Sequence, residues 1–305
     1  MPKIIIFTDL DGSLLHPKTY SFDEARPALK LIKNEGIPLI LCSSKTRAEM
    51  EVYRKRLDNS HPFVSENGGG IFIPEGYFQS ITLTPTLSQR EREQIENPRP
   101  LGEGGTACRV REVEGGWKPG EGVEYEALTI GTPYEELRKA FLKLKQELNA
   151  KVKGFADMTA REIAALSGLT EEEATLAKRR NFGEPFVFEG ETDERFLRAI
   201  EERGLHWTQG RFFHIMGDND KGKAVRILKE FYLKEYGEIV TVALGDGFND
   251  LPMLKEVDYP VLIPKKDGGY DPRVDLQNLM KAKEIGPSGW NEEVLIAIKG
   301  LTMPR

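Results

Sequence analysis

The residues most able to do chemistry in this chain lie in two acidic motifs, and each motif follows an apolar run. Asp9 and Asp11 come directly after the run KIIIFT. Asp246 and Asp250 come soon after the run IVTVAL. Continuous apolar runs of this length are typical of strands buried on both faces of a sheet. Because ligands bind at the carboxyl ends of strands in open α/β sheets, two such parallel neighbours would bring the four aspartates together.

Carboxylates gathered in this way repel one another, and the arrangement is costly unless a cation is present. Asp9 and Asp11 are two residues apart, so along a strand their side chains would point the same way. Gly12 lets the chain turn sharply beside them. A hard divalent cation with oxygen ligands would satisfy the group. Either motif alone could be a helix cap or a turn, but the two together predict a metal site.

A third motif, LCSSKT, contains Ser43 and follows a second apolar run at 37–42. A hydroxyl at this place can donate to a phosphoryl oxygen, and the helix expected from Thr46 directs its N-terminal amides at an anion. An ordinary Ser or Thr helix cap is the alternative interpretation.

A fourth motif surrounds Lys221. The stretch from Gly217 to Lys223 resembles the start of a nucleotide-binding loop, G-x-x-x-x-G-K, but Ala224 stands where such a loop needs Ser or Thr to hold magnesium. We therefore reject a nucleoside triphosphate site. Lys221 is interpreted instead as a fixed cation that neutralises a phosphate and a nucleophile.

The elements around these motifs alternate between strand and helix at both ends of the chain, which predicts a parallel sheet with right-handed crossovers. In the middle of the chain the helix and strand patterns differ from those at the ends, which indicates an α+β insertion between the two halves of that sheet. Strands are expected at 3–8, 37–42, 62–65, 239–244 and 259–263, with helices at 23–34, from Thr46, at 222–235 and from Asp250. Within the insertion we expect a helix at 134–148, two short helices in 160–180, and strands near 123–130, 185–189 and 205–215.

One segment, 82–122, is rich in Gly and Pro and poor in large apolar residues, so we expect a flexible loop or disorder there. It resembles a translated extragenic repeat, and we assign it no catalytic role. A substrate lid is the competing interpretation.

Composition excludes several classes of protein. The net charge of -6 argues against a nucleic-acid partner, and no apolar stretch approaches the length of a membrane span. The first residues lack the features of a signal peptide, so we expect a cytoplasmic protein. Cys42 and Cys108 cannot form a disulfide framework or a four-thiolate zinc site. No two of the four histidines have helical ligand spacing, and each is interpreted as structural or solvent-exposed.

These motifs, in this order, resemble those of the haloacid dehalogenase superfamily: DLDGSLL, the Ser of LCSSKT, the Lys of DKGKA, and GDGFND. The resemblance implies an α/β fold, with a Rossmann-like parallel-sheet core and an inserted α+β cap of the C2 type. The expected core is 1–80 and 216–305, and the expected cap is 81–215. A narrower similarity is to the mannosyl-3-phosphoglycerate phosphatases, through SKTR, ENGGG, RRNFGEPFVFEG, GRFFHIMG, GDGFNDLPML and GPSGWN.

The resemblance also implies a mechanism. Asp9 attacks phosphorus and forms a phosphoaspartyl intermediate, while Asp11 protonates the leaving oxygen and then activates water. Mg²⁺ is held by the Asp9 carboxylate, the Asp11 backbone carbonyl and Asp246, while Asp250 ligates through water or orients the site. Ser43 and Lys221 hold the non-bridging phosphoryl oxygens.

The cap should choose the substrate, expected to be a phosphorylated sugar derivative with an anionic group. Arg180, Arg211 and Arg47 are candidates to bind that anion. The remaining candidates offer polar contacts near the phosphate, and they are Ser44, Asn67, Asn249 and the backbone amides of Gly68 and Gly69.

The expected reaction is therefore magnesium-dependent removal of phosphate, with mannosyl-3-phosphoglycerate as the preferred substrate. Alternatives within the superfamily are glucosyl-3-phosphoglycerate, hexose phosphates or sucrose phosphate, and a phosphomutase reaction. A non-catalytic binding protein on the same fold is the alternative of another class, which the intact motifs argue against.

Overall fold

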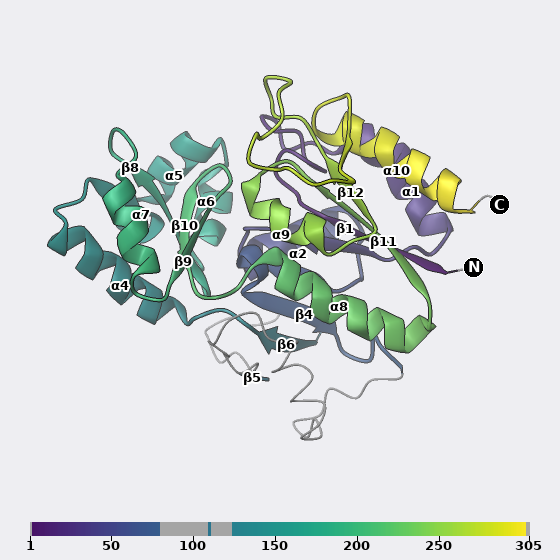
Figure 1. Ribbon diagram of the computed structural model, residues 1–305, viewed down its shortest axis with the longest axis horizontal. Helices are drawn as coiled ribbons and strands as arrows, with labels where there is room; N and C mark the ends of the chain where they lie inside the picture. The colour runs from purple at the N-terminus through teal and green to yellow at the C-terminus, as the bar shows by residue number, and fades with distance from the viewer. Residues whose placement is uncertain (1, 80–108, 111–123, 303–305) are drawn as a thin grey trace.

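Figure 1 shows a computed structural model in which two lobes, a larger core and a smaller cap, lie side by side. The structure describes residues 2–79, 109–110 and 124–302. The prediction of a flexible loop at 82–122 falls outside these residues, apart from the short strand β5 at Arg109–Val110. The α/β fold class predicted from the sequence is confirmed by a parallel sheet with helices on both faces.

The core is built on one nine-stranded sheet whose first six strands are parallel and whose last three are antiparallel. Its order is β13 (Met280–Lys281), β12 (Tyr259–Leu262), β11 (Ile239–Gly245), β1 (Lys3–Thr8), β2 (Leu39–Cys42), β3 (Phe63–Ser65), β4 (Gly70–Pro74), β6 (Tyr125–Thr129) and β5. Strand β1 lies between β11 and β2, so the predicted parallel neighbours are adjacent strands.

Two hydrophobic layers cover this sheet, and they explain why β1 is apolar on both faces. On one face Ile4 and Ile6 pack with helices α1 (Arg26–Asn34), α2 (Arg47–Arg56) and α10 (Gly286–Thr302). On the other face Ile5 and Phe7 pack with α8 (Lys221–Tyr236) and α9 (Leu251–Lys255). The alternation of side chains along a strand gives each layer every second residue.

Residues 23–34, predicted as one helix, form a 3₁₀ turn at Asp23–Ala25 followed by α1. Pro27 lies in the first turn of α1, where its missing N–H costs nothing, so the α-helix begins there.

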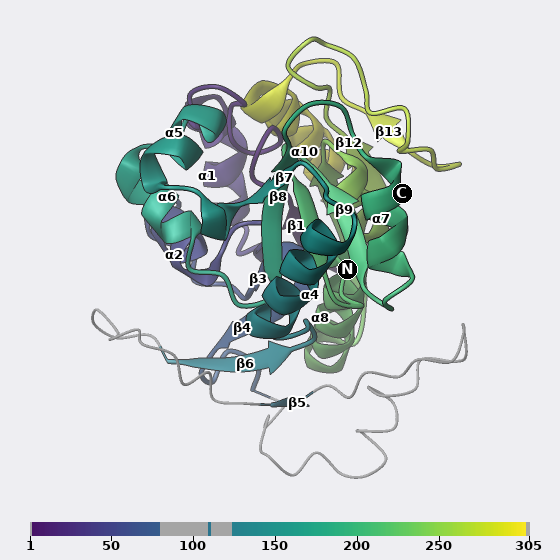
Figure 2. The same ribbon diagram turned by 90° about the vertical axis from the view of Figure 1, so that its left-hand side faces the viewer.

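The cap folds around a four-stranded antiparallel sheet in the order β7, β8, β10 and β9. These strands are Val152–Gly154, Gly183–Phe188, Phe213–Met216 and His206–Gln209. Figure 2 labels three of these strands, β7, β8 and β9. Helices α4 (Tyr134–Glu147) and α7 (Glu194–Glu201) pack on one face of the sheet. Helices α5 (Ala160–Ser167) and α6 (Glu171–Ala177) form a second cluster with the loop around Phe155.

Two features of this middle region differ from the sequence prediction. The strand expected at 205–215 is a hairpin of β9 and β10, because residues at its centre turn the chain back. Strand β6, which the proposed boundary assigned to the cap, pairs with β4 in the core sheet. We therefore propose that the cap begins after Thr129 and ends near Met216. No helix in the described part of the chain is long and apolar enough to cross a membrane.

Helix α10 was not predicted, although Trp290, Val294 and Ile298 recur at helical spacing and are buried against the core sheet. Two glycines in its first turn weaken the helix signal. The Trp290 indole Nε1 donates to Thr8 Oγ1 at 2.9 Å, and Thr8 Oγ1 donates to the Asp9 carbonyl oxygen at 2.7 Å. The C-terminal helix thus supports the end of β1.

Replacing Trp290 with Ala should lower the free energy of unfolding by about 3–5 kcal/mol, because a fully buried aromatic side chain is lost and a cavity remains. Urea denaturation measures this change. Ile296→Ala on the same helix is the control, since Ile296 is 62% exposed and its loss should cost under about 0.5 kcal/mol. Equal losses in the two variants would contradict this role for Trp290.

Candidate active site

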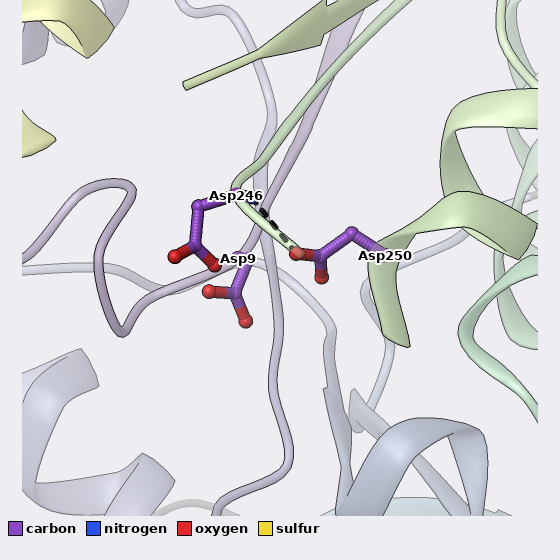
Figure 3. Close-up of side chains that lie close together, drawn as sticks. All are labelled: Asp9, Asp246 and Asp250. Atoms are coloured by element: carbon purple, nitrogen blue, oxygen red, sulfur yellow. Dashed lines mark hydrogen bonds between the residues drawn. The ribbon is translucent and has the colours of Figure 1, made fainter. Parts of the chain in front are cut away.

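Three aspartates meet where β1 and β11 end. Asp9 follows β1, Asp246 follows β11, and Asp250 ends the 3₁₀ turn Phe248–Asp250. One carboxylate oxygen from each lies within 4.8 Å of the others, and Figure 3 shows the three side chains pointing toward a common point. Carboxylate oxygens are the hard ligands that a divalent cation such as Mg²⁺ prefers. This group could therefore hold a metal ion.

A buried lysine at the start of α8 joins two of these aspartates. The Nζ atom of Lys221 lies 2.6 Å from Asp9 Oδ1 and 2.6 Å from Asp250 Oδ1. The Lys221 side chain has no solvent exposure. Asp220 caps α8 by accepting from the Lys223 backbone N–H at 2.8 Å, which sets the position where the helix and Lys221 begin.

Burial and mutual repulsion shift the acid–base equilibria of these groups. Burial raises the pKa of Asp9 well above its usual value, Lys221 lowers it, and Asp250 and Asp246 raise it further. Burial raises the pKa of Asp246 to about 6, against the opposing effect of Lys265. For Lys221, burial favours the neutral amine, but Asp250 and Asp9 prevail and raise its pKa. The site is thus short of positive charge, as a cation-binding site should be.

Asp250 is occupied on both oxygens. Its Oδ1 contacts Lys221, and its Oδ2 accepts from the backbone N–H groups of Asp246 at 2.9 Å and Gly247 at 3.0 Å. Of the two roles predicted for Asp250, these contacts favour orientation of the site over ligation through water.

Asp11 is separate from the cluster of three. Its Oδ2 lies 2.9 Å from the Nζ of Lys45, and its Oδ1 is buried with no hydrogen-bond partner in the part of the chain that the structure describes. Gly12 turns the chain with φ of 85°, and a Cβ there would lie 2.5 Å from Asp246 Oδ2. The structure thus brings three carboxylates to one point and turns the fourth toward Lys45. Ligation through the Asp11 backbone carbonyl stays a prediction.

Above the aspartates lies a cavity of about 460 Å³ that both lobes line. The core contributes the proposed site residues Asp9, Asp11, Ser44, Asp246 and Asn249. The cap contributes Arg180, Arg211, Pro185, Phe212 and His214, among others. Ser43 is fully buried and is not among the lining residues, and its Oγ accepts from the Lys45 backbone N–H at 3.2 Å. Its contact with a phosphoryl oxygen stays a prediction.

Contacts between the lobes close this cavity. Tyr20 Oη donates to the Ser167 carbonyl oxygen at 2.7 Å, and Arg273 donates to Gln209 at 2.8 Å. Thr46 Oγ1 donates to the Leu176 carbonyl oxygen at 3.1 Å. The structure therefore has the cap docked on the core.

Of the three arginines proposed to bind an anion, Arg180 and Arg211 line the cavity and Arg47 does not. Arg180 lies beside the cavity, but its guanidinium donates to the Gly183 and Ser44 carbonyls and pairs with Glu66 at 3.2 Å. Arg211 also lines the cavity. It donates to the Pro17 carbonyl at 2.9 Å and to Tyr20 and the Ser167 carbonyl, so it links the lobes.

Arg47 is not brought to the cavity. Its guanidinium pairs with Glu51 at 3.0 Å and stacks over Phe72 and Tyr125. These contacts lie where α2 packs across β4 and β6, and Arg47 is not among the residues that line the cavity.

The proposed polar residues around 67–69 mainly hold the core together. Asn67 Oδ1 accepts from Asn249 at 3.3 Å, which ties it indirectly to the cavity. A Cβ on Gly68 would lie 2.0 Å from the Asp220 carbonyl oxygen, and one on Gly69 would lie 2.3 Å from Phe182. These glycines allow close packing against the start of α8 and the cap, so their proposed contact with a phosphate gains no support from their position.

The sequence did not point to several residues that line the cavity, and three polar ones matter most for its chemistry. Lys45 adjoins Ser44 in the third motif, and Lys265 follows β12 at the same sheet edge, 3.0 Å from Asp246. Both could have been found by extending the strand-end argument to basic residues. His214 was interpreted as structural or exposed, but it is buried and lines the cavity.

Comparison with known proteins agrees with this geometry. Residues 6–95 match the model of a family described as haloacid dehalogenase-like hydrolase. The chain is 43% identical over 296 residues to the glucosyl-3-phosphoglycerate/mannosyl-3-phosphoglycerate phosphatase of Methanococcoides burtonii, covering 96% of each chain. A protein of the same name from Persephonella marina is 39% identical, over 95% of this chain and 96% of its own. The sucrose-phosphatase of Synechocystis, solved with sucrose and phosphate, has a TM-score of 0.56 at 11% identity, with 98% of each chain covered.

The chain therefore belongs to the haloacid dehalogenase-like hydrolases, within the family that includes these two glycosyl-3-phosphoglycerate phosphatases. The resemblance drawn from the sequence motifs is confirmed.

Replacing Lys221 with Met should lower the free energy of unfolding at pH 7.5 by about 3–5 kcal/mol, because two buried carboxylates lose their partner. The pKa of Asp9 is raised in the folded state, so the folded protein binds this proton more tightly than the unfolded chain. Protonation at lower pH should therefore recover part of the loss. Urea denaturation at pH 7.5 and 5 in the presence of a chelator measures both effects.

Lys223→Met is the matched control, since Lys223 lies on the same helix and pairs with Asp218 near the surface. It should change stability by under about 1 kcal/mol. A Lys221→Met protein as stable as the control at both pH values would contradict the proposed electrostatic role.

Proposed function

We propose that this protein is a phosphatase that removes phosphate from glycosyl-3-phosphoglycerates, with the mannosyl and the glucosyl compounds as substrates. The observation that carries the proposal is the contact of Lys221 with both Asp9 and Asp250, next to Asp246, where Asp9 and Asp246 line a cavity shared by the core and the cap. That arrangement combines a nucleophile, a fixed positive charge and a cation-binding group in one place.

Asp9 is the proposed nucleophile. Its carboxylate oxygen bonds to phosphorus while the bond from phosphorus to the substrate oxygen breaks, which leaves a phosphoaspartyl group. Asp11 gives its proton to the departing oxygen. In the second step Asp11 takes a proton from water, the water oxygen bonds to phosphorus, and the Asp9 carboxylate is released with inorganic phosphate.

Lys221 supplies positive charge where negative charge spreads over the phosphoryl oxygens. Asp9 and Asp246 would hold Mg²⁺, which when bound neutralises charge on the same oxygens. Asp250 keeps Lys221 and the Asp246 backbone in place through its two occupied oxygens. Ser43 is proposed to hold a phosphoryl oxygen together with Lys221, and its Oγ accepts from the Lys45 backbone N–H.

Two observations support the substrate class. The relatives that match nearly the whole chain carry both glucosyl and mannosyl compounds in their names. The cavity, at about 460 Å³, lies in the range of sites for small organic ligands. Among the described residues, five basic side chains line it, namely Lys45, Arg180, Arg211, Lys265 and Lys266. Their positive charge suits a substrate with both a phosphate and a carboxylate.

The test is phosphate release from mannosyl-3-phosphoglycerate, glucosyl-3-phosphoglycerate, sucrose phosphate and hexose phosphates, each with Mg²⁺ or with a chelator. We expect the two glycosyl-3-phosphoglycerates to be hydrolysed best, and the chelator to abolish turnover. Asp9→Asn should lower kcat by at least about a thousandfold, because the amide cannot replace the nucleophile.

Asp267→Asn is the matched control, since this exposed residue at the cavity edge takes no part in the chemistry and should retain activity within about threefold. Release from hexose phosphates alone would contradict the substrate class. Substantial activity in Asp9→Asn would contradict the mechanism, and no phosphatase activity on any substrate would favour a non-catalytic role.

A further inference from the structure

The cap sheet presents two different faces. Along β10, Phe213 and Ile215 pack in the cap's own hydrophobic cluster, so His214 lies on the opposite face, which borders the cavity. The register pairs His214 with Pro185 of β8, which also lines the cavity, and with Thr208 of β9. His214 is therefore a polar residue at the centre of the strand that roofs the site.

The imidazole of His214 has an unusual environment. The residue is 5% exposed, and its Nδ1 atom is buried without a hydrogen-bond partner among the described residues. Leaving a buried polar atom unpaired costs free energy, and such atoms in a ligand cavity are explained when a ligand completes their hydrogen bonding.

The surroundings keep this imidazole neutral. Burial lowers the pKa of His214 well below its usual value, and the positive charges of Arg180 and Lys221 lower it further. A neutral imidazole carries one donor and one acceptor, which matches a hydroxyl group and suits an anion poorly. Arg180 and Arg211 are less suited to bind a hydroxyl, since they are charged and already donate to protein carbonyls.

We propose that His214 is a specificity-determining residue that hydrogen-bonds a hydroxyl of the sugar in the substrate. The inference rests on the proposed function and deepens it, because it assigns the recognition of the uncharged sugar to the cap sheet. The phosphate and the carboxylate are left to the basic side chains. In the glycosyl-3-phosphoglycerates, free hydroxyls occur only on the sugar, so the sugar is the group that a neutral partner would recognise.

The test compares kcat/KM for mannosyl-3-phosphoglycerate with kcat/KM for p-nitrophenyl phosphate, which has no sugar. His214→Leu should lower kcat/KM for the sugar substrate by about tenfold or more and leave the aryl phosphate within about twofold. His214→Gln, which keeps a donor and an acceptor, should retain more activity on the sugar substrate than His214→Leu. Circular dichroism melting of both variants shows whether they fold.

His206→Asn is the matched control, since His206 lies on the same sheet but is exposed and near Asp218 at 3.5 Å. This variant should leave kcat/KM unchanged for both the sugar substrate and the aryl phosphate. Equal losses on the two substrates by folded His214→Leu and His214→Gln, or no loss on either, would overturn the inference while leaving the phosphatase proposal intact.

A different result would contradict the proposed function: a wild-type protein that does not hydrolyse the glycosyl-3-phosphoglycerates. The comparison is then made with the phosphorylated sugar that the wild-type protein hydrolyses best, and the same ratio decides the role of His214. If it hydrolyses no phosphorylated sugar, the proposed function and the role of His214 both fail.

Discussion

The rest of this site depends on one buried ammonium group. Lys221 lies between Asp9 and Asp250 with no exposure to solvent, and each contact measures 2.6 Å. Without that charge, three carboxylates at the ends of β1 and β11 would repel one another in a medium that screens them poorly. The start of α8, fixed by the Asp220 cap, is therefore as much a part of the active site as the strands that carry the aspartates.

The core and the cap contribute different groups to the site, because their polar side chains make different contacts. The core supplies the charged groups that suit phosphate chemistry, and the C-terminal helix supports them through Trp290 and Thr8. The cap closes the cavity through contacts such as Arg211 with the loop at Pro17. Because Arg180 and Arg211, the two cap arginines that line the cavity, already donate to protein carbonyls, we propose that neutral groups on the cap sheet recognise the sugar.

The sequence could predict those parts of the site that follow from short stretches of neighbouring residues. Asp9 and Asp246 were identified because continuous apolar runs indicate buried parallel strands and the residues after them share one sheet edge. Lys221 was identified from its own motif at the start of a predicted helix. Arg47 could not be placed, because its contacts with Phe72 and Tyr125 depend on how α2 packs across β4 and β6. His214 was missed because strand alternation gives two faces, and only docking of the cap decides which face borders the cavity.

We propose that Asp9 and Asp246 form a cation site beside Lys221. An anomalous difference map from crystals of the protein soaked with Mn²⁺ tests this site. We expect one strong peak about 2 Å from a carboxylate oxygen of Asp9 and of Asp246, with Lys221 still in contact with Asp9. A map with Mn²⁺ bound elsewhere and none at these two aspartates would contradict it.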